Sequence, residues 1–165
     1  MRDPTIQLLR DLVAIDSVNP SLVPGGAGEQ EIANFVAAEM RSIGMEVEVN
    51  EVAPGRPNVV GLLESPTPGK TLMLCGHIDT VGVERMAQPF DPVERNGRLY
   101  GRGAGDMKGG VAAMIAAARM LANSGGLKAG RLIVAAVVDE EYASIGAEAL
   151  VRNWSADAAI VTEPT

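Results

Sequence analysis

Hydrophobic and polar positions follow two patterns that alternate along the chain. In some segments apolar residues recur every three or four positions, as they do on the buried face of an amphipathic helix. In others they alternate with polar residues or form a short apolar run, as in strands buried on one face or on both. The helical pattern covers residues 6–15, 32–43, 107–122 and 145–151, and the strand pattern covers residues 45–52, 58–63, 71–75, 132–138 and 158–161. The tight-turn pair Asn96-Gly97 predicts a hairpin over residues 93–100.

The order of these segments predicts an α/β fold. Strands and helices alternate with short connections, which is typical of a largely parallel mixed sheet with helices on both faces, in three layers. No internal repeat, low-complexity segment or linker divides the sequence. Residues 1–165 are therefore interpreted as one domain, or as one part of a larger domain.

Composition and charge exclude several classes of protein. The chain has 14 basic and 21 acidic residues, a net charge of -7, which is the wrong balance for binding nucleic acid or an anionic membrane. No apolar run approaches the ~18 residues that a membrane span needs, and the first residues contain no apolar signal segment. Cys75 is the only cysteine, so no disulfide framework is possible. A cytoplasmic location is expected.

The only histidine and several acidic residues stand where predicted strands end or a predicted helix begins. These residues are His77 and Asp79 after one strand, Asp106 before a helix, Asp139, Glu140 and Glu141 after a second strand, and Glu163 after a third. Ligands of open α/β sheets bind beyond the carboxyl ends of the strands, so these side chains are expected to share one volume. Carboxylates gathered in this way would repel one another unless a divalent cation held them together.

The residue types indicate which metal chemistry to expect. One imidazole with several carboxylates suits Zn, Co or Mn better than a metal that prefers thiolates. Asp79 is placed to accept a hydrogen bond from the second ring nitrogen of His77, which would orient the imidazole. Glu140 and Glu141 are adjacent and therefore diverge, so one can bind metal while the other faces a water molecule and takes its proton.

Each residue also has a simpler interpretation when it is considered alone. A histidine after a strand is often structural, and Asp106 has the position of an ordinary helix N-cap. Glu140 and Glu141 alone would be a solvated pair, Glu163 alone is uninformative, and Cys75 is interpreted as an inert buried thiol. The glycine-rich stretch 101–105 lacks the spacing of a phosphate-binding loop.

Three segments in this order carry a resemblance to a known family. They are LMLCGHIDTV (72–81), YGRGAGDMKGG (100–110) and DEE (139–141). Together they resemble the zinc-dependent aminoacylase and carboxypeptidase family, whose members include acetylornithine deacetylase, succinyl-diaminopimelate desuccinylase, aminoacylase and glutamate carboxypeptidase. The resemblance extends over almost the whole chain. It implies a metal-dependent catalytic domain of the zinc-peptidase type.

The resemblance implies a role for each matching residue. His77 would bind one metal, Asp106 would bridge two, Glu141 would bind the second and Glu163 would complete the first. Glu140 would be the general base and then the general acid. Asp79 would orient His77. Two zinc ions, or cobalt or manganese, would lie ~3.5–4 Å apart in the complete enzyme and act on an amide carbonyl and a water molecule.

The chain departs from the family pattern in its length. Members are much longer and carry an inserted lid domain, through which they often dimerise, and a closing segment. The lid and the closing segment each supply a further histidine. This sequence contains one histidine. It is therefore interpreted as the amino-terminal part of the catalytic domain, expected to be a monomer by itself, to hold at most one tightly bound ion and to be nearly inactive.

The expected function is hydrolysis of a linear amide by a metal-activated water. The substrate would be a small N-acyl amino acid, which loses its acyl group, or a small peptide. Two alternatives stay open: a two-metal aminopeptidase or dipeptidase, and a metal-binding domain without catalysis. Glu140 argues against the last, because a domain that only binds metal needs no base.

Overall fold

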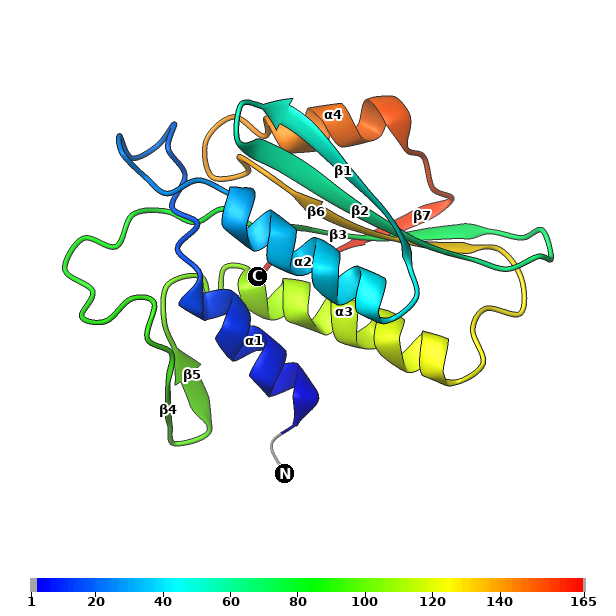
Figure 1. Cartoon of the computed structure of the whole chain (residues 1–165), viewed down its shortest axis with the longest axis horizontal. Coiled ribbons are helices and arrows are strands. Elements are labelled where there is room, and N and C mark those ends of the chain that lie inside the picture. The colour runs from blue at the N-terminus through cyan, green and yellow to red at the C-terminus, as the bar shows by residue number, and fades with distance from the viewer. Residues whose placement is uncertain (1–2, 165) are drawn as a thin grey trace.

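Helix α1 (Pro4–Ala14) begins with a cap that its sequence encodes. In the computed structural model, which describes residues 3–164, the Asp3 carboxylate accepts a hydrogen bond from the Thr5 amide at 2.8 Å (Figure 1). Pro4 stands in the first turn, where its missing N–H costs no hydrogen bond. The other elements are α2 (Gln30–Ser42), α3 (Lys108–Asn123), α4 (Ile145–Asn153), β1 (Glu46–Ala53), β2 (Arg56–Glu64), β3 (Thr71–His77), β4 (Val93–Arg95), β5 (Arg98–Tyr100), β6 (Arg131–Val137) and β7 (Ala158–Val161).

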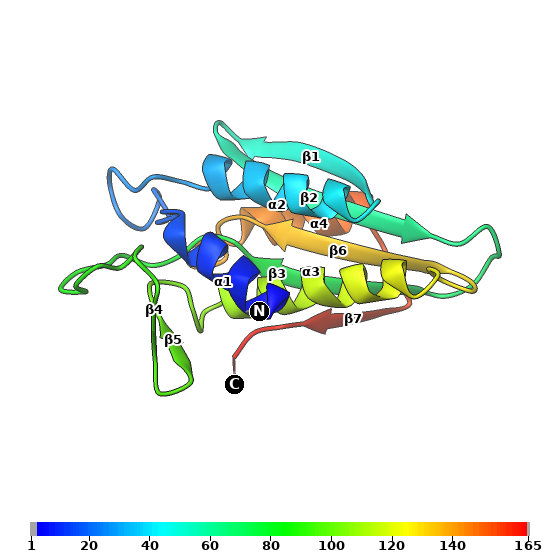
Figure 2. The same ribbon diagram turned by 60° about the horizontal axis from the view of Figure 1, so that its bottom comes forward.

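Five strands form the main sheet in the order β1-β2-β6-β3-β7 (Figure 2). Strand β3 is parallel to both β6 and β7, whereas β2 is antiparallel to both β1 and β6. All strands of this sheet except β2 therefore run in one direction, which confirms the predicted largely parallel mixed sheet. Strands β4 and β5 pair separately as a hairpin. Its turn residues Asn96 and Gly97 have φ angles of 51° and 70°, as the predicted tight turn requires.

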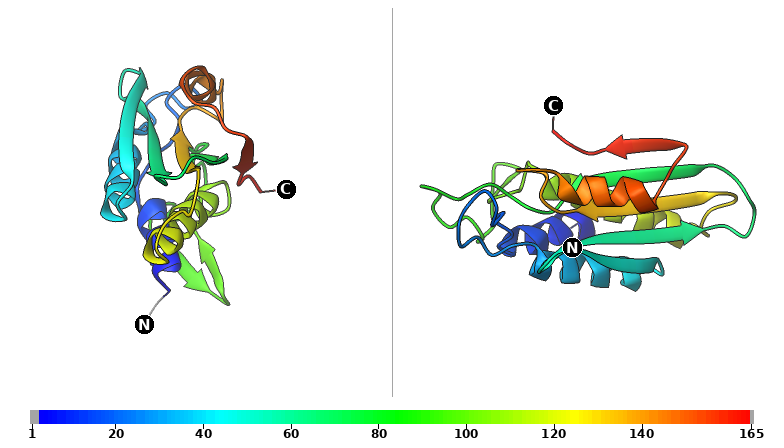
Figure 3. Two further views of the ribbon diagram at one scale, coloured as in Figure 1. Left: turned by 90° about the vertical axis from the view of Figure 1, so that its right-hand side faces the viewer. Right: turned by 90° about the horizontal axis from the view of Figure 1, so that it is seen from above.

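Helices cover both faces of the main sheet, as predicted (Figure 3). Helices α1, α2 and α3 pack on one face and enclose the larger apolar core, to which β3 and β6 contribute Leu74, Val134 and Ala136. Helix α4 packs on the other face, where Leu150 contacts a smaller cluster that includes Met73 and Ile133. The alternation of residues between the two clusters along β3 and β6 follows from the two-residue period of a strand.

Two details differ from the prediction because they depend on neighbours in space. The alternation of residues 45–52 places Val49 with Met45 and Val47 on the buried side of β1, but Val49 is 41% exposed, since β1 is an edge strand. Strand β2 begins at Arg56, two residues before the predicted start, and both Arg56 and Asn58 are buried. No helix within residues 3–164 combines the length and apolar character needed to cross a membrane.

Candidate metal centre

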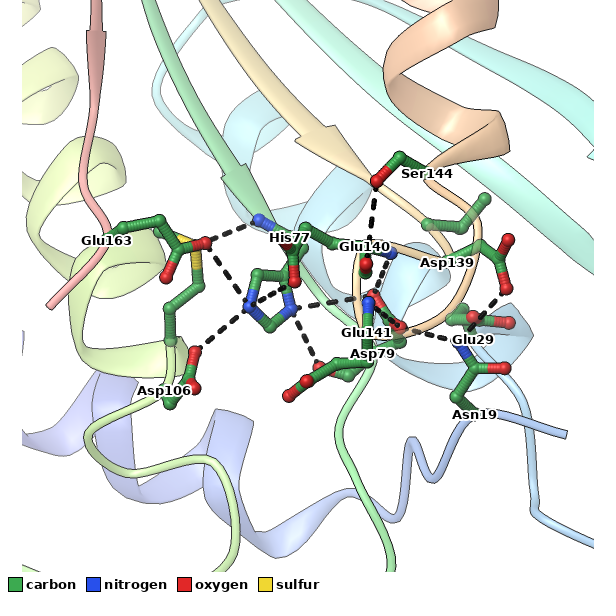
Figure 4. A network of polar contacts seen from close by, with 12 residues as sticks. Asn19, Glu29, His77, Asp79, Asp106, Asp139, Glu140, Glu141, Ser144 and Glu163 are labelled. Carbon is green, nitrogen blue, oxygen red and sulfur yellow. Dashed lines mark hydrogen bonds and ion pairs between the residues drawn. The ribbon is translucent and has the colours of Figure 1, made fainter. Parts of the chain in front are cut away.

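The parallel strands deliver the predicted residues to one edge of the sheet. His77 is the last residue of β3, Asp139 to Glu141 follow β6, and Glu163 follows β7. Asp106 precedes α3, which packs beside β3. Figure 4 shows these side chains converging from four segments that are far apart in the sequence. The topology thus brings them to one volume, as expected for the carboxyl ends of parallel strands.

The imidazole of His77 is buried, and its two nitrogens face different partners. Nδ1 lies 2.9 Å from the backbone carbonyl oxygen of Asp79 and 3.4 Å from the Asp79 carboxylate. Because a carbonyl oxygen only accepts hydrogen bonds, Nδ1 is the nitrogen that carries the proton in the neutral ring. When the ring is neutral, as a metal ligand must be, the lone pair of Nε2 points toward the space between the surrounding carboxylates. This is the orientation that a metal-ligating histidine requires.

Three side chains can each offer one ligand atom to a common ion. Nε2 of His77 lies 3.1 Å from Oδ1 of Asp106 and 3.3 Å from Oε1 of Glu163. The three candidate ligand atoms all lie within 4.8 Å of one another. The Asp106 side chain is 57% exposed and the Glu163 side chain 35%, so the group opens to solvent. It is therefore accessible both to an ion and to a small ligand.

Glu140 and Glu141 lie differently with respect to this group. Oε2 of Glu140 is 3.7 Å from Nε2 of His77, and the Glu140 side chain is 46% exposed. Glu141 contributes no atom to the group of three, although its carboxyl is close enough for the charges of Asp106 and Glu140 to affect it. Of the two glutamates, Glu140 therefore has a carboxylate oxygen within 4 Å of Nε2 of His77, and Glu141 stands outside the group of three.

The crowding of acidic groups changes several pKa values. Burial raises the pKa of Glu163, and the charges of Asp106 and Glu140 raise it further. Burial also raises the pKa of Glu141, together with the charges of Asp106, Asp79 and Glu140. For His77, burial acts to lower the pKa, but Asp79, Glu163 and Asp106 outweigh it and raise the pKa to about 9. The site is thus rich in negative charge, which a bound cation would stabilise.

The Asp79 carboxylate is fully buried, and it accepts hydrogen bonds from other groups in addition to facing His77. Its Oδ1 accepts the Glu140 amide at 3.1 Å, and its Oδ2 accepts the Glu141 amide at 3.2 Å. Oδ2 also accepts the side-chain amide of Asn19 at 2.7 Å. Burial raises the pKa of Asp79, but the hydrogen bonds from His77, Asn19 and Glu140 more than compensate, so the pKa lies below its ordinary value. The carboxylate therefore remains charged although it is buried.

A group of four residues is linked to this carboxylate; three of them, Asn19, Glu29 and Arg56, had no predicted role, whereas Asp139 was expected beside Glu140 and Glu141. Asn19, Glu29, Arg56 and Asp139 are all buried and linked by hydrogen bonds or ion pairs. Asn19 lies in Ser17-Val18-Asn19-Pro20, whose residue types predict only a turn, and Arg56 stands two residues before the strand predicted over residues 58–63. A buried charge in an otherwise apolar strand gives no periodic signal. Only its partners, 27 and 83 positions away in sequence, show that Arg56 is compensated.

Two simpler interpretations from the sequence can now be compared with the structure. Asp106 is not the N-cap of α3, because the helix begins at Lys108 with Met107 as its cap residue and without a side-chain cap bond. Its carboxylate contacts His77 instead. Cys75 is partly buried, and burial together with the Glu163 charge raises the pKa of its thiol to about 11. The prediction of an unreactive thiol agrees with this environment.

Comparison with known proteins identifies the family. The model of peptidase family M20/M25/M40 matches residues 73–165, the segment that carries His77, Asp106, Glu140, Glu141 and Glu163. The chain belongs to this family. The resemblance found in the sequence is thereby confirmed. The fold agrees: human carnosine dipeptidase 1 superposes with a TM-score of 0.78 and 25% identity over 95% of this chain and 37% of that enzyme.

Two curated M20 relatives match nearly the whole chain. N-formyl-4-amino-5-aminomethyl-2-methylpyrimidine deformylase of Bacillus subtilis (strain 168) is 32% identical over 98% of this chain and 39% of its own length. Acetylornithine deacetylase of Vibrio atlanticus (strain LGP32) is 34% identical over 97% of this chain and 43% of its own length. The chain thus spans about two fifths of the length of the M20 relatives it matches.

Proposed function

We propose that residues 1–165 are the amino-terminal part of the catalytic domain of a metal-dependent amide hydrolase. The observation that carries this proposal is the orientation of His77. Its Nδ1 faces a backbone carbonyl, and its Nε2 faces Asp106 and Glu163, with Glu140 alongside. A histidine with only a structural role would not need three carboxylates around its second nitrogen.

The residues present fit a divalent cation. His77, Asp106 and Glu163 would hold it, and one nitrogen with carboxylate oxygens is a donor set that suits zinc, cobalt or manganese. We expect one tightly held ion in this chain. In a complete enzyme Asp106 would bridge to a second ion held by Glu141, with further ligands from the remaining three fifths of the relatives' length.

The proposed reaction is hydrolysis of a linear amide. A bound divalent cation supplies Lewis acidity toward a water molecule and toward the amide carbonyl. Glu140 has an exposed carboxylate next to His77, so it can take the proton of the attacking water and later give it to the departing amine. Asp79 keeps the His77 ring in one orientation throughout, because its carbonyl and carboxylate both face Nδ1.

The names of the relatives support a substrate class. Acetylornithine deacetylase and the formylpyrimidine deformylase are named for the removal of a small acyl group, so we propose a small N-acyl amino acid or related amide as the substrate. A dipeptidase is the second candidate, favoured by the structural similarity to carnosine dipeptidase 1. We further propose that the protein is cytoplasmic and that this chain by itself is a monomer.

Metal content and substrate preference test the proposal. Chain purified without chelators should contain about one zinc, cobalt or manganese ion by elemental analysis. Hydrolysis is then assayed in a polypeptide extended to the length of the relatives, using N-acyl amino acids and dipeptides. Glu140→Gln should lower the rate about 10²–10⁴-fold while the metal content is kept. Exposed Glu148, in α4, provides the control Glu148→Gln, which should retain full activity. Metal-free protein, or undiminished hydrolysis by Glu140→Gln, would contradict the proposal.

A further inference from the structure

The turn that carries the two glutamates is held from two sides by buried polar groups. This segment, residues 139–144 and here called the acidic turn, begins with Asp139 in the left-handed region at φ 65°. The backbone carbonyl of Asp139 accepts the amides of Ala143 and Ser144 and so closes the turn on itself. From the other side, the Asp79 carboxylate accepts the amides of Glu140 and Glu141.

Asn19 and Arg56 connect these two supports. The side-chain amide of Asn19 donates to Oδ2 of Asp79 at 2.7 Å and to Oδ1 of Asp139 at 3.0 Å. Nη1 of Arg56 lies 2.9 Å from the same Oδ1 of Asp139, and the rest of its guanidinium is paired with Glu29. The series Arg56, Asp139, Asn19, Asp79 thus leads without interruption from strand β2 to His77.

The energetics of burial point to a role other than stability. Glu29, Asp79 and Asp139 are at most 1% exposed and Arg56 is 7% exposed. Taking charges out of water costs several kcal/mol per ion, and apolar replacements of such pairs are often equally stable or more so. These buried charges lie next to the acidic turn and add little net stability. Their presence is therefore better explained by the backbone geometry that they impose on that turn.

We propose that Asn19 and Arg56 are positioning residues: they act through Asp79 and Asp139 to fix the backbone of Glu140 and Glu141 relative to His77. Neither contacts the candidate metal group itself. The significance for catalysis rests on the proposed function, since Glu140 is the proposed base. The positioning itself is a property of this chain and can be measured without metal or substrate.

Amide hydrogen exchange read residue by residue tests this directly. In the wild-type chain the Glu140 and Glu141 amides should be protected although their side chains are solvent-accessible. Arg56→Met should accelerate exchange of both amides tenfold or more, because it leaves the buried Asp139 carboxylate without its cation, while amides in the centre of β6 should lose less protection. Arg56→Lys should restore part of the protection. Arg119→Met is the matched control, because Arg119 pairs with Glu39 away from the turn and should leave both amides unchanged.

Metal affinity gives a second readout. Asn19→Ala should weaken binding of Co²⁺ about 10- to 100-fold, because Asn19 donates to the Asp79 carboxylate that orients His77. Arg56→Met should weaken it less, because Arg56 reaches Asp79 only through Asp139 and Asn19. Asn19→Ala also serves if Arg56→Met does not fold.

Three results would each overturn the positioning role. They are unprotected Glu140 and Glu141 amides in the wild type, unchanged protection in the variants, and a uniform loss of protection over the whole sheet. If the exchange results hold but no metal binds, the proposed function fails and the positioning role stands.

Discussion

The amide nitrogen of Glu140 lies 3.1 Å from Oδ1 of Asp79. Asp79, two residues after the end of β3, therefore holds the turn that follows β6, and the two bonded residues are 61 positions apart in the sequence. Because the same carboxylate faces His77, the orientation of the imidazole and the placement of Glu140 depend on one buried group. A change at Asp79 should consequently affect both.

Asp79→Asn is predicted to destabilise the fold. An asparagine NH₂ would replace an oxygen that faces hydrogen-bond donors, at a cost of about 1–3 kcal/mol for each donor left unsatisfied. Urea unfolding at neutral pH measures this loss. Asp11→Asn is the control, since the Asp11 carboxylate accepts an exposed hydrogen bond from Gln7 at the surface, and it should change stability little. Equal stability of Asp79→Asn and wild type would show that the buried carboxylate is not needed in its charged form.

Added metal is predicted to stabilise the chain through His77. An ion that binds only the folded state contributes about 2.7 kcal/mol at 100 times its dissociation constant. For a domain of this size that amounts to a rise in Tm of about 5–10 °C. Thermal unfolding with Co²⁺ and after dialysis against EDTA should show this difference for the wild type and its absence in His77→Gln. The same rise in both proteins would place the binding elsewhere.

Asp157 is predicted to give a pH-dependent contribution to the pairing of β7 with β3. Its carboxylate accepts bonds from Lys70 Nζ at 2.6 Å and from the Thr71 amide at 2.8 Å, and these lower its pKa below the ordinary 3.8. Because the pKa of Asp157 is lower in the folded state than in the unfolded chain, its contribution to folding stability is complete above about pH 4. This contribution is lost as the pH falls through the folded-state pKa. Wild type should therefore be more stable than Asp157→Ala at pH 7, and the difference should diminish as the pH falls below about 4 through the lowered pKa.

This expectation is checked by urea unfolding of both proteins between pH 7 and pH 3. The difference should also shrink in high salt, because the pair is at the surface. A difference that stays constant over the whole pH range would mean that the carboxylate charge has no part in the pairing.

Gly146→Ala is predicted to disturb the start of α4. A Cβ at this position would lie 2.5 Å from the backbone nitrogen of Val138 and 2.7 Å from Oδ1 of Asn58, so the helix would have to move away from the sheet. Overpacking of this kind costs about 1–3 kcal/mol. Gly105→Ala is the control, because a Cβ there has no neighbour within 4 Å. Urea midpoints that do not differ between the two variants would contradict the predicted contact.

Much of the fold could be predicted because it is encoded locally. The three- and four-residue spacing of residues 32–43 and the apolar run 132–138 anticipated α2 and β6 closely. The antiparallel direction of β2 was not predicted, although the turn pair Pro54-Gly55 joins it directly to β1. Its pairing with β6 joins segments that are far apart in the sequence and arises only when the sheet forms. The exposure of Val49 has the same origin: the periodicity of a strand does not show whether that strand lies at an edge.

For the candidate site, the residue types at strand ends and before α3 were sufficient to nominate Asp106, Glu140 and Glu163 beside His77. The structure places these three carboxylates around Nε2 of His77. The sequence offered Asp79 as the partner of His77 but did not reveal that it also binds the acidic turn. The buried partner Asn19 left no pattern, because a single polar residue in a turn has the same appearance whether it is solvated or buried.

The sequence by itself determined which helices and strands form and that a histidine and several acidic residues lie at their ends. This is because periodicity and turn residues act over a few neighbouring positions. Only the tertiary structure decided that Asp106 faces His77 instead of capping α3, and that Arg56 and Asn19 lie beneath the acidic turn. The physical reason is that hydrogen bonds and burial depend on distance in space, and these pairs become neighbours only when the parallel strands assemble.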